Sequence, residues 1–269
     1  MPADSRFKLA SLQAYQDKIL ATARPSMQMI LNPSSKLSLW QSKIGGTHYY
    51  LPVNTPHPQN THGQAMFMLA QINCAELPPH DNLPKEGILQ FYIDADDDLL
   101  GLDFHNRLAQ VGFKILFHSH ITTDTTQLQT ITTPQWEYTP IDQEYAISFH
   151  PETQYISVED ADFGQAILDI PRHDSHEDIS EHIPEGNTLL QDYAEAFPAI
   201  GHRLGGYPFF TQSDPRDDDE ALADYILLLQ IDSEGDIMWG DSGVCNFFIH
   251  PDDLKNQDFS KVLYNWDCY

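Results

Sequence analysis

The sequence predicts an α+β fold that consists mainly of short antiparallel strands and begins with a helix. Three observations lead to this prediction. Short apolar segments alternate with segments rich in Pro, Gly, Asn and Asp, which is typical of strands joined by turns. Near the start of the chain, apolar side chains recur at near-helical spacing. A set of motifs occurs twice in the same order, which indicates two pseudo-repeated halves.

Helices are expected at residues 5–24, at 188–197 and in a short turn that begins near Pro251. Pro25 and Pro198 end the first two, because proline lacks an amide hydrogen and clashes with the preceding turn. Strands are expected at 47–51, 66–73, 87–94, 111–120, 145–149, 154–158, 207–211, 224–232 and 243–250. Residues 171–187 are expected to form an acidic loop, since they offer few apolar side chains to bury.

The internal repeat predicts a single domain over residues 1–269, with copies at about 36–121 and 200–267 and a variable insertion at 122–199. Two such copies would pack with pseudo-two-fold symmetry, and a groove between them is a natural place for a ligand. The matched motifs are Ile44-Gly45-Gly46 with Leu204-Gly205-Gly206, Leu69–Asn73 with Leu228–Asp232, Gly87–Ile93 with Gly243–Ile249, Asp97–Leu99 with Asp252–Leu254, Asp103-Phe104 with Asp258-Phe259, and Lys114–Phe117 with Lys261–Tyr264.

Each copy carries a glutamine inside an apolar strand, Gln71 in the first and Gln230 in the second. A buried glutamine needs hydrogen-bond partners. Each side chain therefore either ties down a loop of its own copy or faces a cleft and binds a ligand.

The matched motifs resemble the YwqG-like family of bacterial proteins, a family of unknown function. The resemblance covers about residues 36–265 and is most specific in the second copy, at Leu204–Pro208, Gln212, Leu228–Asp232 and Trp239–Gly243. It implies an α+β fold with two partly similar, barrel-like β halves. It supplies no catalytic residues.

The segment Trp239–Gly243 has no counterpart in the first copy. Trp239 could stack on a ligand that Asp241 hydrogen-bonds. Alternatively, Asp241 satisfies the amides of a turn while Trp239 closes the core.

His118 and His120 are separated by one residue and would share one face of a strand. With a third ligand from elsewhere in the fold they could bind a metal ion, so a metal-assisted hydrolase is the alternative function. Apart from this alternative, the sequence predicts no metal and no cofactor. It contains neither a Gly-x-Ser-x-Gly nor a Gly-x-x-x-x-Gly-Lys motif.

The formal net charge is −26, and residues 122–194 carry 15 acidic groups against Arg172 alone. Such a surface repels phosphate backbones, so we expect no nucleic-acid partner. No segment has the roughly 18 apolar residues of a membrane span. Three cysteines without close pairs, and no signal-peptide pattern, predict a cytoplasmic protein.

These observations favour a soluble, non-catalytic binding protein. The expected ligand is a basic protein partner or a small molecule in the groove between the copies. A mimic of nucleic-acid charge that occupies a DNA-binding protein is a further possibility, which requires carboxylates at phosphate-like spacing on one face.

Overall fold

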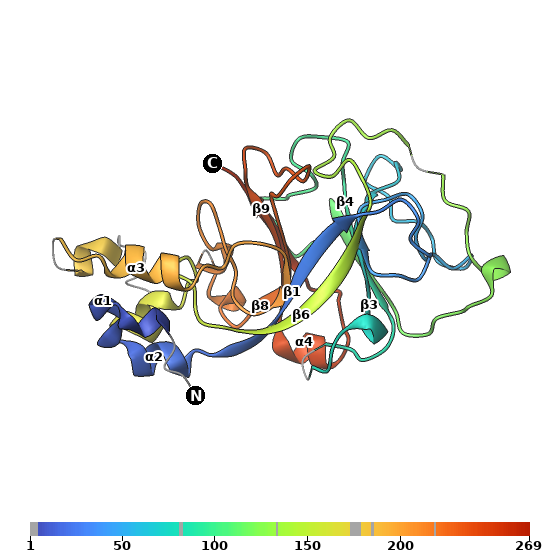
Figure 1. Cartoon of the computed structure of the whole chain (residues 1–269). Helices are drawn as coiled ribbons and strands as arrows, with labels where there is room; N and C mark the ends of the chain where they lie inside the picture. Colours follow the sequence, from blue (N-terminus) through green and yellow to red (C-terminus); the bar gives the residue numbers. More distant parts are fainter. Residues whose placement is uncertain (1–4, 81–82, 133, 173–178, 184–185, 218) are drawn as a thin grey trace.

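The computed structural model describes residues 5–80, 83–132, 134–172, 179–183, 186–217 and 219–269. Within these residues, ten strands form one sheet in the order β10-β9-β8-β7-β1-β6-β2-β3-β4-β5, and every pairing is antiparallel. The sheet curls into a nearly closed barrel, and a small helical layer lies beside it (Figure 1). The predicted α+β class with short antiparallel strands is confirmed.

The strands are β1 (Arg24–Pro33), β2 (Lys43–Ile44), β3 (Phe67–Asn73), β4 (Ile88–Ile93), β5 (Phe113–His118), β6 (Tyr145–Gln154), β7 (Arg203–Gly205), β8 (Ile226–Asp232), β9 (Val244–Ile249) and β10 (Leu263–Asp267). The α-helices are α1 (Ala10–Gln13), α2 (Gln16–Ala21), α3 (Leu189–Ala196) and α4 (Pro251–Lys255). Short 3-10 turns lie at Ser5–Lys8, Cys74–Glu76, Thr125–Gln127, Ile179–His182, Pro215–Asp217 and Glu220–Leu222, and a π turn at Gly164–Leu168.

The long β1–β6 pair forms the centre of the sheet, and matching sets of four strands flank it. β2 pairs with β6 so that Ile44 faces Tyr145, and β7 pairs with β1 so that Leu204 faces Met27. Met27 of β1 therefore corresponds to Tyr145 of β6. If this correspondence is continued along both strands, Ile30 corresponds to Ser148. These two residues also face each other across the β1–β6 ladder. A pseudo-two-fold axis thus passes through this pair.

The outer strands repeat the correspondence. Gln71 faces Gln90 in one half, and Gln230 faces Asn246 in the other. Both inner ladders also contain an irregularity at the same place, between Met68 and Ala70 and between Leu227 and Leu229.

One sequence match requires correction. The sequence aligned Lys114–Phe117 with Lys261–Tyr264, but Ile115 faces Phe91 and Tyr264 faces Phe247. Ile115 therefore corresponds to Tyr264, two residues further along. The two alignments differ by two residues, and side chains alternate with a period of two along a strand, so both alignments place apolar residues on the same face. The lysine at the start of each motif favoured the incorrect alignment.

Aromatic side chains from the two halves meet inside the barrel. The ring centroids of Phe91 and Phe247 lie 5.0 Å apart, and those of Phe113 and Tyr264 lie 5.1 Å apart. These four residues belong to one buried cluster that contains side chains from both halves. The halves therefore share one core, and neither buries its own apolar face alone.

The helix predicted at 5–24 forms as three short pieces, and Arg24 and Pro25 belong to β1 instead. The alternation of Met27 and Met29, both buried, with the exposed Gln28 is the period-two signal that identifies this strand. The short helices pack with α3 in a separate apolar cluster outside the barrel (Figure 1). The helix predicted at 188–197 and the turn at Pro251 are observed as α3 and α4.

The segments 47–51 and 207–211, expected as strands, are not strands. Both follow a double glycine, Gly45-Gly46 or Gly205-Gly206, whose four φ angles lie between 67° and 87°. These left-handed conformations turn the chain out of the sheet at the ends of β2 and β7. Residues 173–178 and 184–185 of the expected acidic loop lie outside the described residues.

A matched pair of substitutions tests this role of the double glycines. Gly206 and Gly63 both have φ of +77°. An added Cβ would clash with Gln154 Oε1 at Gly206, whereas it meets nothing within 4 Å at Gly63. Gly63→Ala should cost about 1–2 kcal/mol of unfolding free energy through φ alone. Gly206→Ala should cost roughly 1–3 kcal/mol more, because it adds a steric clash.

Urea unfolding monitored by circular dichroism measures both values. Equal losses for the two variants would show that close packing at Gly206 does not constrain this turn.

Candidate functional site

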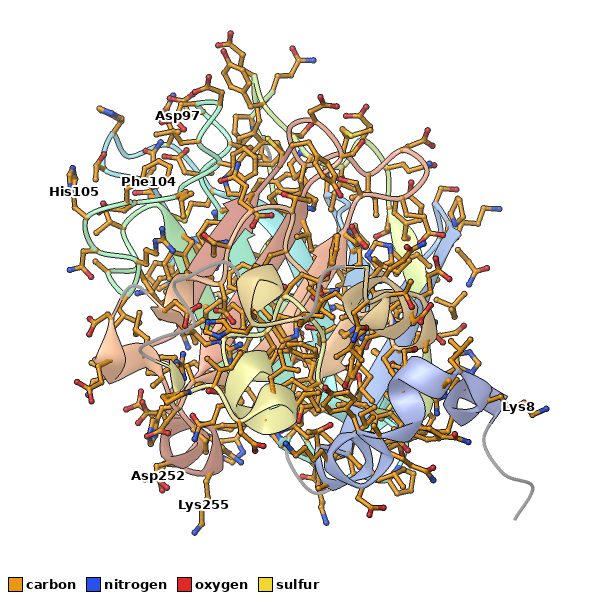
Figure 2. The ribbon with its side chains drawn as sticks, turned by 90° about the vertical axis from the view of Figure 1, so that its left-hand side faces the viewer. Lys8, Asp97, Phe104, His105, Asp252 and Lys255 are labelled. Carbon is orange, nitrogen blue, oxygen red and sulfur yellow. The ribbon has the colours of Figure 1, made fainter. Side chains whose placement is uncertain are left out.

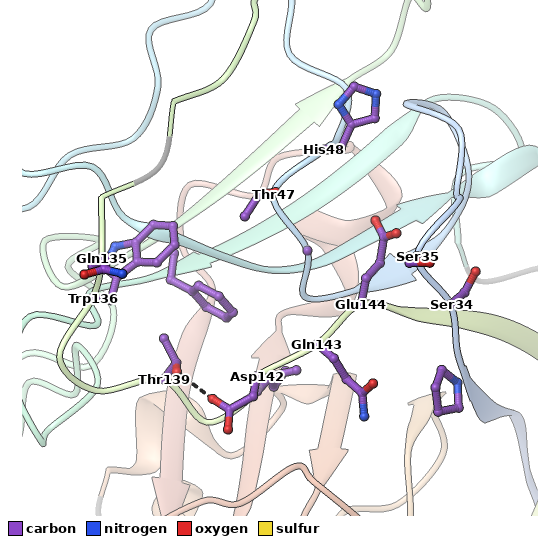
Figure 3. A pocket seen from close by; sticks show the side chains of 14 residues that line it. Ser34, Ser35, Thr47, His48, Gln135, Trp136, Thr139, Asp142, Gln143 and Glu144 are labelled. Carbon is purple, nitrogen blue, oxygen red and sulfur yellow. Dashed lines mark hydrogen bonds between the residues drawn. The ribbon is translucent and has the colours of Figure 1, made fainter.

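A cleft of about 920 Å³ opens where β6 and β3 diverge (Figure 3). β2 separates these strands only at Lys43 and Ile44, and the chain then leaves at the double glycine. We call this site the acidic cleft. Its lining residues are Pro33, Ser34, Ser35, Gly46, Thr47, His48, Phe67, Gln135, Trp136, Thr139, Ile141, Asp142, Gln143 and Glu144.

Two carboxylates from one segment, those of Glu144 and Asp142, set the charge of the acidic cleft. Glu144 Oε1 accepts a hydrogen bond of 2.9 Å from Lys43 Nζ, which also donates to the carbonyl oxygen of His48 at 2.6 Å. Lys43 is fully buried, and this burial lowers its pKa although Glu144 opposes the shift. The ammonium group of Lys43 thus forms an ion pair with Glu144 and does not face the cleft.

Asp142 is exposed and accepts a hydrogen bond of 3.2 Å from the Thr139 hydroxyl. In Figure 3 its carboxylate lies below Trp136 and apart from Glu144. Gln143, which lines the cleft, donates to Asp236 Oδ2 at 2.7 Å, so a third carboxylate, from the second half of the chain, lies behind this lining residue. The cleft therefore carries a net negative charge.

Trp136 forms an aromatic wall of the acidic cleft. Its indole Nε1 donates to the carbonyl oxygen of Ala65 at 2.8 Å, and its ring packs edge-on against Phe67 with centroids 5.1 Å apart. These two contacts fix the ring opposite Ser34, Ser35 and Glu144 (Figure 3). A fixed indole in a cleft that also carries carboxylates is an environment that attracts organic cations.

The structure also contains a groove between the two halves. It has a volume of about 540 Å³ and lies where β1 and β8 diverge. Pro79 and Leu83 of the first half and Leu204, Ile226 and Leu254 of the second contribute to its walls. We call it the apolar groove.

Gln71 is fully buried, and its hydrogen bonds remain within its own half. Its Nε2 donates to the carbonyl oxygens of Leu39 and Gln41 at 2.9 and 2.8 Å, and its Oε1 accepts the amide of Tyr50 at 3.0 Å. Gln90 donates to both Gln71 Oε1 and the Tyr50 carbonyl oxygen. The two glutamines thus hold both backbone polar groups of Tyr50.

Gln230 makes the corresponding contacts in the second half. It donates to the carbonyl oxygens of Ala199 and Gly201, both at 2.8 Å, and accepts the amide of Phe209 at 2.8 Å. Asn246 donates to the Phe209 carbonyl oxygen at 3.0 Å. Neither Gln71 nor Gln230 lines the acidic cleft or the apolar groove. Ligand binding by these glutamines stays a prediction.

Trp239 and Asp241 do not point to a common site. Trp239 is fully buried in the barrel core, where its Nε1 has no hydrogen-bond partner among the described residues. Asp241 is exposed, and its carbonyl oxygen accepts the amide of Tyr269 at 3.3 Å. A ligand contact for this pair stays a prediction.

His118 and His120 differ in environment. His118 ends β5 and is half-buried, whereas His120 lies beyond the strand and is exposed. His118 Nε2 lies 3.0 Å from Gln90 Oε1, an acceptor, so this nitrogen carries the proton. Within the described ranges, no group of three or more His, Cys, Asp or Glu side chains is placed to hold a metal ion.

Sequence reasoning missed the residues of the acidic cleft. Trp136, Asp142 and Glu144 belong to the segment that was interpreted as a variable insertion, and no local motif marks them. The double glycine was the available signal, because residues without a Cβ suit a tight turn or a close backbone approach. It does not show which segment lies against it.

The sequence profile of the family described as a domain of unknown function (DUF1963) matches residues 42–268, so the chain belongs to this family. Comparison with curated proteins finds no match. In the described part of the chain, no helix combines the length and apolar character needed to cross a bilayer.

The pKa of His118 predicts a pH dependence of stability. Burial lowers this pKa to about 4, whereas an unfolded histidine titrates near about 6.5. Between these values the unfolded state binds the additional proton, so stability falls as pH falls from about 6.5 to about 4. After allowance for the partial exposure of the ring, the loss of unfolding free energy attributable to His118 is on the order of 2 kcal/mol.

His118→Gln retains a donor for Gln90 but has no titrating ring. The difference in unfolding free energy between pH 7 and pH 4.5 should be smaller in this variant than in the wild type. His62→Gln, at an exposed histidine, is the control and should leave the difference unchanged. An unchanged pH dependence in His118→Gln would contradict the assignment.

Proposed function

We propose that the protein is a non-catalytic binding protein whose acidic cleft receives a lysine or arginine side chain of a basic protein partner. The observation that carries this proposal is the fixed indole of Trp136 beside the exposed carboxylate of Asp142. An organic cation can contact the ring face while it pairs with the carboxylate.

The charge of the whole chain supports the proposal. The net charge of −26 attracts a basic partner over a distance set by ionic strength. Acidic side chains such as Asp97 and Asp252 point outward from the body in Figure 2. Long-range attraction would accelerate the encounter, and the acidic cleft would fix the position of one side chain.

Titration of a fluorescent oligo-arginine peptide, followed by anisotropy, tests the proposal. Asp142→Asn should weaken binding up to about fivefold, as expected for an exposed ion pair. Trp136→Leu should weaken it by a similar factor through loss of the cation–π contact. Raised salt should weaken binding to the wild type.

Asp224→Asn is the matched control, because it removes one exposed carboxylate outside the acidic cleft. Equal loss in Asp224→Asn and Asp142→Asn would show that the peptide responds only to net charge. If Trp136→Leu bound the peptide as tightly as the wild type, Trp136 would not be part of the binding site.

We further propose that the chain is a cytoplasmic, YwqG-like single domain, in which copies at about 36–121 and 200–267 arose by duplication. The matched ladders and the matched glutamine contacts support the duplication. Hydrolase chemistry at His118 and His120 receives no such support, since the two rings occupy different environments.

A further inference from the structure

A second exposed aromatic side chain lies two residues beyond Trp136. Tyr138 is 39% exposed, and its amide donates to the carbonyl oxygen of Ala95 at 3.1 Å. Ala95 belongs to the loop that follows β4 and continues with Asp97 and Asp98. The tertiary structure thus brings an acidic loop of the first half next to the segment that carries both aromatic side chains.

Carboxylates surround the ring of Tyr138. The charged groups that act on its hydroxyl are Glu137, Asp98 and Asp97, and their negative charge raises the pKa of Tyr138. All three side chains are exposed, and Asp97 projects outward from the body in Figure 2. A cation at this ring would therefore be attracted both by the π face and by the carboxylates.

The ring of Tyr138 lies next to the acidic cleft without being part of it. Trp136 lines the cleft, whereas Tyr138 is not one of its lining residues. Two residues of chain separate Cα atoms by at most about 7 Å. The two rings therefore define neighbouring but separate positions for a cation.

Hydrogen bonds to both halves of the chain hold this segment in place. Trp136 Nε1 donates to the carbonyl oxygen of Ala65, and the Tyr138 amide donates to that of Ala95. The carbonyl oxygen of Pro140 accepts the amide of Met238, from the second half, at 2.8 Å. A surface that is already ordered loses little conformational entropy when a partner binds.

We propose, building on the binding function proposed above, that the basic partner presents two cationic side chains at positions i and i+2 of one extended segment. One enters the acidic cleft beside Trp136 and Asp142, and the other contacts the ring of Tyr138 and its neighbouring carboxylates. Side chains at i and i+2 of an extended segment point to the same side and lie about 7 Å apart, which matches the spacing of the two positions.

Fluorescence anisotropy of the full chain with three labelled peptides tests this proposal. In a glycine–serine background, the peptides carry one arginine, two arginines separated by one residue, or two arginines separated by eight residues. The closely spaced pair should bind up to about fivefold more tightly than the widely spaced pair, as expected for one additional exposed ion pair. The two peptides have the same charge, so net charge alone predicts equal affinity.

Tyr138→Leu should bring the two double-arginine peptides to equal affinity, because it removes the second aromatic surface. In this background the single-arginine peptide should still respond to Asp142→Asn, which would show that the acidic cleft is intact. Asp224→Asn is again the control for charge and should leave the ratio of the two affinities unchanged. Thermal unfolding verifies that each variant is folded.

Equal affinities of the two double-arginine peptides for the wild type overturn the proposal. An unchanged affinity ratio in folded Tyr138→Leu also overturns it. If the single-arginine peptide bound to the wild type and to Asp142→Asn with equal affinity, the function proposed above would fail, and this inference with it.

Discussion

The structure depends on two buried amide clamps that hold the segments leaving the sheet. Gln71 and Gln90 bind both backbone polar groups of Tyr50, and Gln230 and Asn246 do the same for Phe209. A buried amide without partners costs about 1–3 kcal/mol per unsatisfied group. Each clamp replaces ladder hydrogen bonds that its segment cannot make after it turns out at a double glycine. The segments 47–51 and 207–211 can therefore be buried although they are not strands.

Once these segments leave the sheet, the flanking strands have no partner between them at that level. β6 diverges from β3 on one side of the pseudo-two-fold axis, and β1 diverges from β8 on the other. The two openings are the acidic cleft and the apolar groove. Both sites thus form where a short strand ends at a double glycine, which occurs once in each half. The aromatic core that the halves share at Phe91 and Phe247 stabilises both.

The same backbone carries different chemistry in its two openings. Asp142 and Arg24 occupy corresponding positions with opposite charges, while Gly46 and Gly206 retain similar φ angles of 87° and 77°. The glycines cannot change, because a side chain would meet Glu144 or Gln154 in left-handed backbone. The rim residues face solvent and carry no such constraint, so they could diverge after a duplication. Functional difference within a pseudo-symmetric barrel is expected at these positions.

The sequence by itself determined the α+β class, the apolar strands, which it placed at 66–73, 87–94, 224–232 and 243–250, and the correspondence of Gln71 with Gln230. These features rest on local patterns, since strand periodicity and the order of repeated motifs lie within short windows. It also marked the double glycines. Only the tertiary structure decided what lies opposite them. Glu144 lies against Gly46, and Trp136 and Asp142 line the same cleft, from a segment about a hundred residues away in sequence. The register of one long ladder places Arg24 opposite Gln154. Strand pairing and register depend on packing against distant residues, which no local pattern encodes.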